Sequence, residues 1–450
     1  MTRVFQRQIK VDMPLAVGGE GLYIVDSEGK RYLDASGGAA VSCLGHGDAD
    51  VIAAIKGQLD ALAFAHTAFF SSHPAEKLAD RLITLAPEGI EMVYFLSGGS
   101  EAVEASLKMA RQYFLEIGEH RRTRFIARRQ SYHGNTIGAL SVSGNMMRRE
   151  PYKGMLMNCG LISPCYPYRG QRDDELETEY GQRVADELEN EILRLGPENV
   201  AAFIAETVGG ATAGVLPPVE GYFMRIREIC DKYGVLLILD EVMSGMGRTG
   251  TLFACEQEGI VPDLICIAKG LGAGYQPIGA TLVSARVFAA FRDGSGMFQH
   301  GHTYMGHPTA CAAALAVQNK IAALDLLTNV RRQGEVLVDK LHERFGKHPN
   351  IGNIRGRGLF QGIELVADRA TKDPLDPKLK IHARIKTQAM QNGLICYSGG
   401  GTADGEKGDH VLLAPPFIIE APEIADLVDR LGNAIDAALE GAGVCRSGGA

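Results

Sequence analysis

Between residues 91 and 284, short apolar segments alternate with stretches of helical periodicity. The apolar segments lie at 92–97, 124–129, 201–206, 235–240, 264–268 and 280–284, and helical patterns cover 101–117, 177–195 and 222–233. Continuous apolar strands are typical of a sheet whose two faces are covered by helices. Alternation of such strands with helices indicates a largely parallel sheet. The sequence therefore predicts an α/β fold with this sheet at its centre.

The two ends of the chain show a different pattern of predicted strands and helices from the central region. LYIVDSEGKRYLD at 22–34 contains two strand patterns around a Ser-Glu-Gly turn, which predicts a β-hairpin. A long helical region at 308–345 is followed by strand patterns and by helices at 378–392 and 422–439. We expect a small α+β domain with an N-terminal segment at 1–55 and a C-terminal part at 330–450, and a large domain at 56–329. The Gly-rich segment 398–409 is expected to be a flexible loop.

Composition limits the partners and the location of the chain. The 46 Lys and Arg against 54 Asp and Glu give a formal charge of −8, with no long basic run, so nucleic acid and membrane are not expected as partners. No apolar run reaches the roughly 18 residues of a bilayer span. The N-terminus lacks the apolar core of a secretion signal, which predicts a cytoplasmic protein. Nine cysteines without a C-x-x-C pair, Cys445 being the last, predict reduced thiols.

The segment GMGRTG at 245–250 formally matches the G-x-G-x-x-G pattern of dinucleotide-binding loops. Such a loop directly follows a strand and opens a long helix early in its domain. Here Asp240 and Glu241 separate the strand from the glycines, and no clear apolar-periodic helix follows Gly250. We therefore predict a turn at this segment. A nicotinamide-dependent oxidoreductase remains the alternative from another class of enzyme.

Glycines and serines follow the strand at 92–97, where SGGSEAVEASLKMARQYF begins a helix. Gly98 and Gly99 let the chain bend after Ser97, and Ser100 is expected near the N-cap of the helix. Unpaired backbone N–H groups and the positive end of the helix dipole can hold a phosphate or a carboxylate there. An ordinary capped helix after a tight turn fits the same letters, so this segment alone leaves both interpretations open.

Lys269 and Asp240 each end an apolar strand and are the clearest candidates for chemistry. The carboxyl ends of parallel strands line the cleft where open α/β sheets bind ligands, so both side chains are expected at one cleft. A lysine whose pKa is lowered by burial can attack a carbonyl. A carboxylate can keep a pyridine nitrogen protonated, and the pair supplies what pyridoxal phosphate requires. When Lys269 is considered alone, a solvated lysine at a strand end is the alternative.

Ten segments of the chain, in their order, resemble the class III (ω-type) pyridoxal-phosphate-dependent aminotransferases of fold type I. They are GLYIVDSEGKRYLDASGG, LGHGDADV, SGGSEAVE, SYHGNT, AFIAE, LDEVMSGMGRTG, IAKGLGAGYQPIGA, HGHTYMGHP, RGRGLF and LLAPPFII. They extend over nearly the whole chain, and ten in order are specific where any one is weak. The resemblance implies an α/β fold with a mostly parallel sheet of the seven-stranded type. It also implies pyridoxal 5'-phosphate as the cofactor.

The same resemblance implies roles for individual residues. Lys269 would form the internal aldimine and shuttle the proton, Asp240 would pair with the pyridine nitrogen, and Glu206 would lie near cofactor and substrate as a further catalytic residue. The remaining cofactor contacts would come from Ser97, Gly98, Gly99, Ser100, Tyr132, His133, Val242, Met243 and Thr303. Tyr132 and Val242 would cover the two faces of the ring. Thr303 would reach the phosphate of the neighbouring subunit, which implies a homodimer with shared sites.

Two positions depart from the family pattern. Met243 stands where many members have a glutamine that reaches the phenolic oxygen of the cofactor, and methionine cannot donate that hydrogen bond. Tyr397 lies near the position of a flexible arginine that binds a substrate carboxylate, so Arg355, Arg357 or the partner subunit is expected to bind it instead. The predicted substrate contacts are Ala40, Phe70, Tyr132 and Tyr397.

These features predict an aminotransferase that moves an amino group from a primary amine or ω-amino acid to an oxo acid such as pyruvate, with ping-pong kinetics. A decarboxylating transaminase or an aminomutase of the same family is the alternative, since these enzymes share the apparatus and differ in which Cα bond breaks. A scaffold that binds the cofactor without turnover is a third hypothesis. No metal is expected, because loop and interface packing is the preferred interpretation of His300, His302 and His307.

Overall fold

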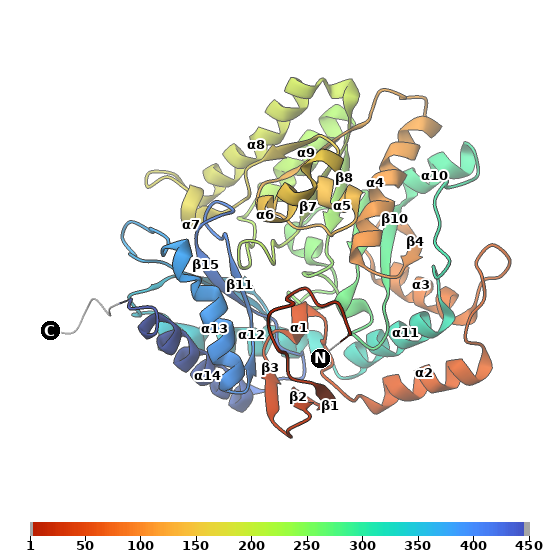
Figure 1. Ribbon diagram of the computed structural model, residues 1–450. Helices are drawn as coiled ribbons and strands as arrows, with labels where there is room; N and C mark the ends of the chain where they lie inside the picture. Colours follow the sequence, from red (N-terminus) through yellow and green to blue (C-terminus); the bar gives the residue numbers. More distant parts are fainter. Residues whose placement is uncertain (1–2, 445–450) are drawn as a thin grey trace.

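The computed structural model describes residues 3–444, and a seven-stranded sheet lies at its centre (Figure 1). The strand order is β4-β10-β9-β8-β7-β5-β6. The bounds are β4 Ile90–Leu96, β5 Arg124–Arg128, β6 Cys159–Ile162, β7 Val200–Glu206, β8 Leu236–Asp240, β9 Leu264–Ile267 and β10 Gly279–Ser284. Neighbouring strands are parallel except where β10 pairs with β4 and β9. The predicted α/β fold with a mostly parallel sheet of seven strands is therefore confirmed.

Six of these strands lie where the continuous apolar segments predicted them, to within two residues at each end. The seventh, β6, was not predicted. It has four residues, only the last of which is fully buried, because it forms an edge of the sheet. An edge strand this short lacks the continuous apolar run by which its neighbours are recognised.

Helices cover both faces of the sheet, as the apolar strands predict. Along β7, Phe203 packs in the core cluster that contains α8 (Glu177–Leu195) and α9 (Tyr222–Tyr233). The next residue, Ile204, packs on the opposite face against α4 (Gly99–Glu116). The same two clusters include side chains of α3 His73–Leu85, α5 Ile137–Ser141, α10 Ala285–Asp293 and α11 Pro308–Ala323. The sheet is thus the middle layer of three.

Two smaller sheets bring the ends of the chain together (Figure 1). One contains β1 Ala16–Glu20, β2 Tyr23–Asp26, β3 Arg31–Asp34 and β13 Leu394–Ile395, and β13 runs parallel to β3. The other is antiparallel and contains β11 Ile351–Arg357, β12 Phe360–Leu365, β15 Asp409–Leu413 and β14 Tyr397–Gly400. Their core is completed by α12 Leu326–Phe345, α13 Ile381–Gln391 and α14 Ala421–Glu440. The hairpin of β2 and β3 is confirmed, whereas the domain boundaries at 55/56 and 329/330 stay predictions.

The Gly-rich segment 398–409 was predicted to be a flexible loop, and the structure has a loop at its centre, residues 401–408, between two strands. Its start belongs to β14 and its end to β15, and the two strands pair from Tyr397 opposite Leu412 to Gly400 opposite Asp409. The pairing satisfies backbone groups that glycines alone would leave to solvent. Strand formation here depends on a neighbouring strand, which glycine content does not reveal.

The helical region at 308–345 is divided into α11 and α12, which meet at an angle of 67°. The break follows from Asp325, whose φ of 47° lies in the left-handed region. Within residues 3–444 no single helix is long and apolar enough to cross a membrane, and only this bent pair reaches such a length together.

Short elements make up many of the connections. They are α1 Gly37–Ala40, α6 Met146–Arg149, α7 Pro167–Gly170 and the 3-10 turns η1 Glu150–Met155, η2 Pro197–Asn199, η3 Ala254–Glu258, η4 Lys269–Leu271 and η5 Pro377–Leu379, and the longer helix α2 Ala49–Ala61 follows α1. The eight cysteines within the described chain are all free thiols, as predicted for them. Cys445 lies outside the described residues.

Candidate active site

A cavity of about 390 Å³ opens at the carboxyl ends of β4, β7, β8 and β9. The predicted site residues that line it are Ser97, Gly98, Gly99, Ser100, Tyr132, His133, Glu206, Asp240, Val242, Met243 and Lys269. These residues come from loops far apart in the sequence. The parallel sheet brings them together, because the strand ends that carry them meet along one edge.

The first wall of the cavity is the start of α4. Gly98 is its N-cap, and the backbone N–H of Ser97 donates to Glu101 Oε2 at 3.0 Å. Ser100 therefore lies in the first turn of the helix, near the N-cap as predicted. No side chain of the described chain caps the first N–H groups of this 18-residue helix. Such a free helix N-terminus attracts an anion.

Gly99 occupies a position that only a glycine can fill. A Cβ built there would lie 2.8 Å from Cγ1 of Val242. The opposite side of the helix start is held by Ser100, whose Oγ donates to Asn135 Oδ1 at 3.0 Å. The close approach of Gly99 to Val242 joins the anion site to the loop that follows β8.

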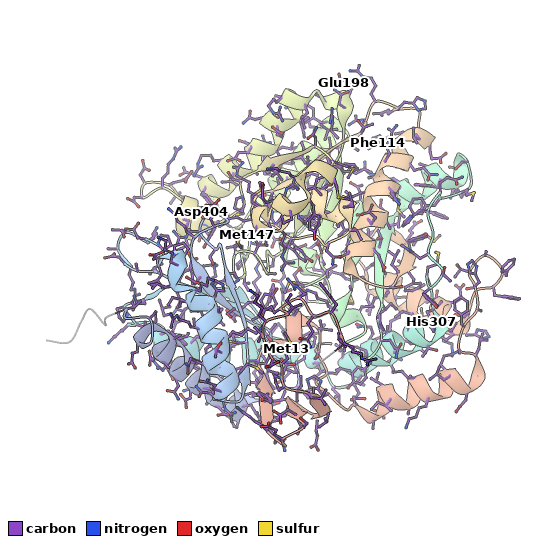
Figure 2. All side chains as sticks on the ribbon, viewed as in Figure 1. Met13, Phe114, Met147, Glu198, His307 and Asp404 are labelled. Atoms are coloured by element: carbon purple, nitrogen blue, oxygen red, sulfur yellow. The ribbon has the colours of Figure 1, made fainter. Side chains whose placement is uncertain are left out.

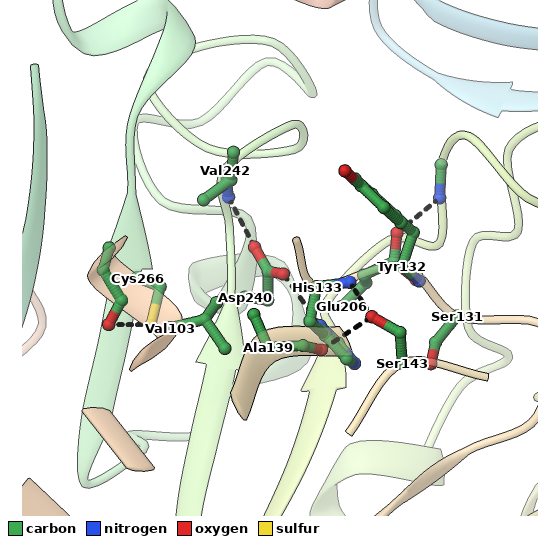
Figure 3. A network of polar contacts seen from close by, with 12 residues as sticks. Val103, Ser131, Tyr132, His133, Ala139, Ser143, Glu206, Asp240, Val242 and Cys266 are labelled. Atoms are coloured by element: carbon green, nitrogen blue, oxygen red, sulfur yellow. Dashed lines mark hydrogen bonds and ion pairs between the residues drawn. The ribbon is translucent and has the colours of Figure 1, made fainter. Parts of the chain in front are cut away.

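Asp240 ends β8 and is 5% exposed. Its Oδ2 lies 2.8 Å from Nδ1 of His133, and its Oδ1 accepts a hydrogen bond from the backbone N–H of Val242 at 3.0 Å (Figure 3). The backbone N–H of His133 in turn donates to Ser143 Oγ at 2.8 Å. These contacts fix the carboxylate in one orientation while leaving lone pairs for another donor. The geometry favours an orienting role for His133.

Glu206 ends β7 and is the neighbour of Asp240 in the register of the sheet. Its Oε2 accepts from the backbone N–H of Tyr132 at 3.3 Å, and its Oε1 accepts from that of Gly210 at 3.1 Å (Figure 3). Burial raises the pKa of Glu206, and the charge of Asp240 also raises it. His133 acts in the opposite direction and lowers it. Two buried carboxyl groups thus share one edge of the cavity with the ring of Tyr132.

Lys269 follows β9 and begins η4 with a φ of 45°, a conformation that few residues other than glycine adopt. Within the described chain its amine forms no hydrogen bond. Burial lowers the pKa of Lys269 to about 8, although the charges of Asp240 and Glu206 act in the opposite direction. An amine with this pKa is neutral in a larger fraction of molecules near pH 7 than an ordinary lysine, and the neutral form is the nucleophile.

Four predicted residues lie outside the lining of this cavity. Ala40 and Tyr397 pack beside it, in an apolar cluster that also contains Met243. Phe70 is 69% exposed, and Thr303 lies exposed on the connection between α10 and α11. The chain by itself therefore does not bring Phe70 or Thr303 to the site.

Arg355 and Arg357 are committed elsewhere, so the expectation that either binds a substrate carboxylate is not supported. Arg355 donates from Nη1 to Glu364 Oε2 at 2.7 Å and from Nη2 to the carbonyl of Ala213 at 2.6 Å. Arg357 forms an ion pair with Glu258 at 2.5 Å. Neither guanidinium lines the cavity.

The segment 245–250 forms consecutive turns, and no α-helix opens after them, which agrees with the turn predicted there. Arg248 in this segment is buried and donates from Nη1 to the carbonyls of Leu359 at 3.0 Å and Pro415 at 2.6 Å. The glycines therefore serve a packing contact with the C-terminal half of the chain. The loop and helix that a dinucleotide needs are not formed at this position.

Sequence reasoning missed several residues that line the cavity, namely Gly134, Val208, Ala268, Gly274, Gln276, Pro277 and Ile278. Most of them are sequence neighbours of predicted residues, so their loops were recognised but not the individual positions. Gly134 could have been found by its motif: a Cβ there would lie 2.6 Å from Ser100 Oγ, and its φ is 137°. In residues 3–444, no group of three or more His, Cys, Asp or Glu side chains is arranged to hold a metal ion.

The site fits pyridoxal phosphate in three respects. The free N-terminus of α4 can hold the phosphate, the buried carboxylate of Asp240 can meet the ring nitrogen, and the unpaired amine of Lys269 can bond to the aldehyde. Gly99 lets the helix start approach the ring site closely. Fold and site together define a pyridoxal-phosphate-dependent transferase of fold type I.

The family within this class follows from comparison with known proteins. The family model of class III aminotransferases matches residues 7–435. The chain therefore belongs to the class III aminotransferases, and the resemblance recognised in its ten segments is confirmed. It is an enzyme of the aminotransferase type that depends on pyridoxal phosphate.

Relatives and solved structures agree over nearly the full length. An uncharacterized aminotransferase of Schizosaccharomyces pombe is 49% identical over 94% of this chain and 92% of its own length. A chloroplastic gamma aminobutyrate transaminase of Solanum lycopersicum is 37% identical over 92% of this chain and 79% of its own. A PLP-bound amine transaminase from an uncultivated Pseudomonas species superposes with a TM-score of 0.90 at 38% identity, covering 97% of this chain and 98% of that one.

Proposed function

We propose that this aminotransferase moves an amino group from a primary amine or ω-amino acid to an oxo acid such as pyruvate. The observation that carries the proposal is the placement of the Lys269 amine and the Asp240 carboxylate in one cavity with a free helix N-terminus. The gamma aminobutyrate transaminase and the amine transaminase among its relatives support this donor class. A single site that serves donor and acceptor in turn predicts ping-pong kinetics.

When bound, pyridoxal phosphate supplies an aldehyde carbon for the amino group and a ring that spreads the charge left when a proton leaves Cα. Asp240, oriented by His133, holds a proton at the ring nitrogen. Lys269 Nζ would move the proton between Cα of the substrate and the neighbouring carbon of the cofactor, a transfer that its lowered pKa favours. The backbone N–H groups at the start of α4 would orient the phosphate, and Glu206 holds the backbone of Tyr132, whose side chain would cover the ring.

A homodimer with shared sites is part of the proposal. Thr303 and Phe70 lie exposed in the single chain, and the nearby Tyr304 and Phe69 are 61% and 79% exposed. Phe64 contacts Tyr304 with ring centroids 5.7 Å apart, so the two segments form one aromatic surface. Burial of such a surface against a second copy would bring Thr303 toward the partner's phosphate site. A cytoplasmic location is also proposed, and the free thiols of the described chain support it.

The proposal is tested by the visible absorption spectrum of the purified protein loaded with pyridoxal phosphate. We expect an absorption band of the bound cofactor that one or more amines convert to the pyridoxamine form, from a panel of β-alanine, taurine, putrescine, 1-phenylethylamine and ornithine. Pyruvate should then restore the band and yield alanine. Release of carbon dioxide, or an isomeric amine without need of an acceptor, would favour a decarboxylating transaminase or an aminomutase instead. Absence of any band with added cofactor would contradict the proposal.

A further inference from the structure

Arg148 lies on α6, next to the wall of the cavity, and the known roles of the site do not use it. Its guanidinium stacks over the ring of Tyr132, 4.4 Å from the ring centroid. Tyr132 lines the cavity together with Lys269. Arg148 is half-buried, and its guanidinium makes no hydrogen bond or ion pair with any other part of residues 3–444.

The backbone around Arg148 is firmly held although its side chain is free. The next residue, Arg149, donates from Nη1 to the carbonyls of Leu140 at 2.9 Å and Ser143 at 2.8 Å, which ties α6 to α5. Asn145 Oδ1 accepts from the backbone N–H of Arg148 at 3.2 Å. Two consecutive arginines thus differ sharply: one is used to anchor the helix, and the other presents an unpaired cation beside the site.

Met147, the residue before Arg148 on α6, lies close to the turn between β14 and β15. A Cβ at Gly401 would lie 3.3 Å from Cε of Met147, and Gln130 Nε2 donates to the carbonyl of Thr402 at 2.7 Å. Figure 2 shows Met147 and Asp404 on this side of the molecule. The hairpin that carries Tyr397 therefore supports the element that carries Arg148.

A substrate carboxylate needs a cation at this site. Glu206 and Asp240 place negative charge on the cavity, and Lys269 is required for the chemistry. Arg355 and Arg357 are paired with carboxylates elsewhere. Burial is the largest of the causes that lower the pKa of Lys269. The charge of Arg148 is also among these causes, so it acts on the site. A planar guanidinium is also the group best suited to hold a carboxylate with two parallel hydrogen bonds.

We propose that Arg148 binds the carboxylate of the amino acid donor and of the oxo acid acceptor. The inference rests on the proposed aminotransferase function and narrows its substrate class. Amines that carry a carboxylate group are preferred over amines of the same length that lack this group. Arg148 moves from the Tyr132 ring to the substrate, and the flexible arginine chain allows this without movement of α6.

The test compares Arg148→Leu and Arg148→Lys with the wild-type holoenzyme. The matched control is Arg121→Leu, an exposed arginine that precedes the amino end of β5 and so lies at the edge of the sheet away from the site. The rate of the donor half-reaction is followed by cofactor absorbance with two pairs, β-alanine with propylamine and 4-aminobutyrate with butylamine. Binding of butanoate, which cannot react, is titrated by the change in the same absorbance.

We expect Arg148→Leu to raise the half-saturating concentration of the carboxylate donors and the Kd of butanoate roughly 10- to 100-fold, as loss of a charge-assisted hydrogen bond implies. The increase in half-saturating concentration for the matched amines should be at least tenfold smaller. Arg148→Lys should recover part of the affinity for carboxylates. Arg121→Leu should behave as wild type. Equal losses within each pair, or unchanged butanoate binding, would overturn the inference. So would faster release of pyridoxal phosphate from Arg148→Leu, which would assign Arg148 to the phosphate. Because butanoate binding needs no turnover, it tests Arg148 even if transamination itself fails.

Discussion

Two groups of buried charged side chains in the described chain can be compared, and they differ in how completely they are paired. One group lies in the candidate active site and consists of Glu206, Asp240 and Lys269. The other joins α7 to the antiparallel C-terminal sheet and consists of Arg169, Arg355 and Glu364. In the second group both oxygens of Glu364 accept from guanidinium groups at 2.7 Å, and the Tyr166 hydroxyl donates to the same carboxylate. In the first group the lysine amine has no hydrogen bond at all within the described chain.

Full pairing marks a charge that stabilises the fold, whereas a missing partner marks a charge that is available to a ligand. Glu364 is paired with two guanidinium groups and a hydroxyl, and a buried carboxylate held in this way stabilises the fold. Lys269, in contrast, is left free beside two carboxyl groups, and burial lowers its pKa to about 8. An unpaired, perturbed group in a cavity is typical of a site that waits for a ligand. By this criterion Arg355, which the sequence suggested for substrate binding, belongs to the structural group.

The largest effect is expected for Lys269→Ala. Removal of the amine eliminates both the covalent attachment and the proton transfer, so transamination should fall by about 10⁴-fold or more. The melting temperature should change little, because the lysine makes no hydrogen bond that the fold depends on. The rate is measured from amine and pyruvate to alanine, with Lys232→Ala, an exposed lysine paired with Glu189, as the control. Retained activity in Lys269→Ala would remove the basis of the assignment.

The second group should respond in the opposite way. Glu364→Ala leaves Arg169 and Arg355 without their buried carboxylate, and breaking such a network is expected to cost about 3–5 kcal/mol of unfolding free energy. Urea unfolding measures this loss. The control is Glu198→Ala, which breaks the exposed pair with Arg121 and should cost about 1 kcal/mol or less. Folded Glu364→Ala should keep its rate per molecule. A large loss of rate without loss of stability would contradict the distinction between the two groups.

Asp240→Asn is expected to give the next largest effect. The neutral amide cannot hold the ring nitrogen protonated, so the rate should fall by about 10²- to 10³-fold, the range for loss of one preorganised electrostatic contact. Bound cofactor should remain, because the start of α4 is unchanged. Cofactor content is measured by absorbance and the rate by alanine formation. An unchanged rate would show that Asp240 does not act at the ring.

Much of the fold could be predicted because its central strands are buried on both faces. β7 and β8 are apolar throughout, so their letters alone identify them. β6 and β14 could not be found in this way. β6 is a four-residue edge strand, and β14 contains two glycines that become extended only by pairing with β15. These two strands depend on pairing with strands that lie elsewhere in the chain, and the local sequence pattern does not reveal that pairing.

The residues of the site also fall into those that the local sequence identifies and those that only the folded chain reveals. Lys269 and Asp240 could be recognised because a charge at the end of an apolar strand is conspicuous, and the family resemblance then located Tyr132 and Gly99. Arg148 could not, because its interest depends on a ring contact and on the absence of a partner within the described residues. Arg355 was misjudged for the converse reason, since its carboxylate partner, Glu364, lies on the next strand, and only the pairing of β11 with β12 reveals it.

The smallest effect sharpens the contrast between a free and a paired buried charge. The pKa of Lys269, lowered by burial to about 8, implies that the neutral amine increases with pH up to that value and little beyond it. Uptake of pyridoxal phosphate by the apoenzyme should therefore accelerate about tenfold per pH unit below about pH 7.5 and level off above about pH 8.5. In Asp240→Asn the midpoint should move to lower pH, because the charge of Asp240 raises the pKa of Lys269. A rate that continues to increase toward pH 10 in the wild-type apoenzyme would mean that Lys269 titrates as an ordinary solvated lysine.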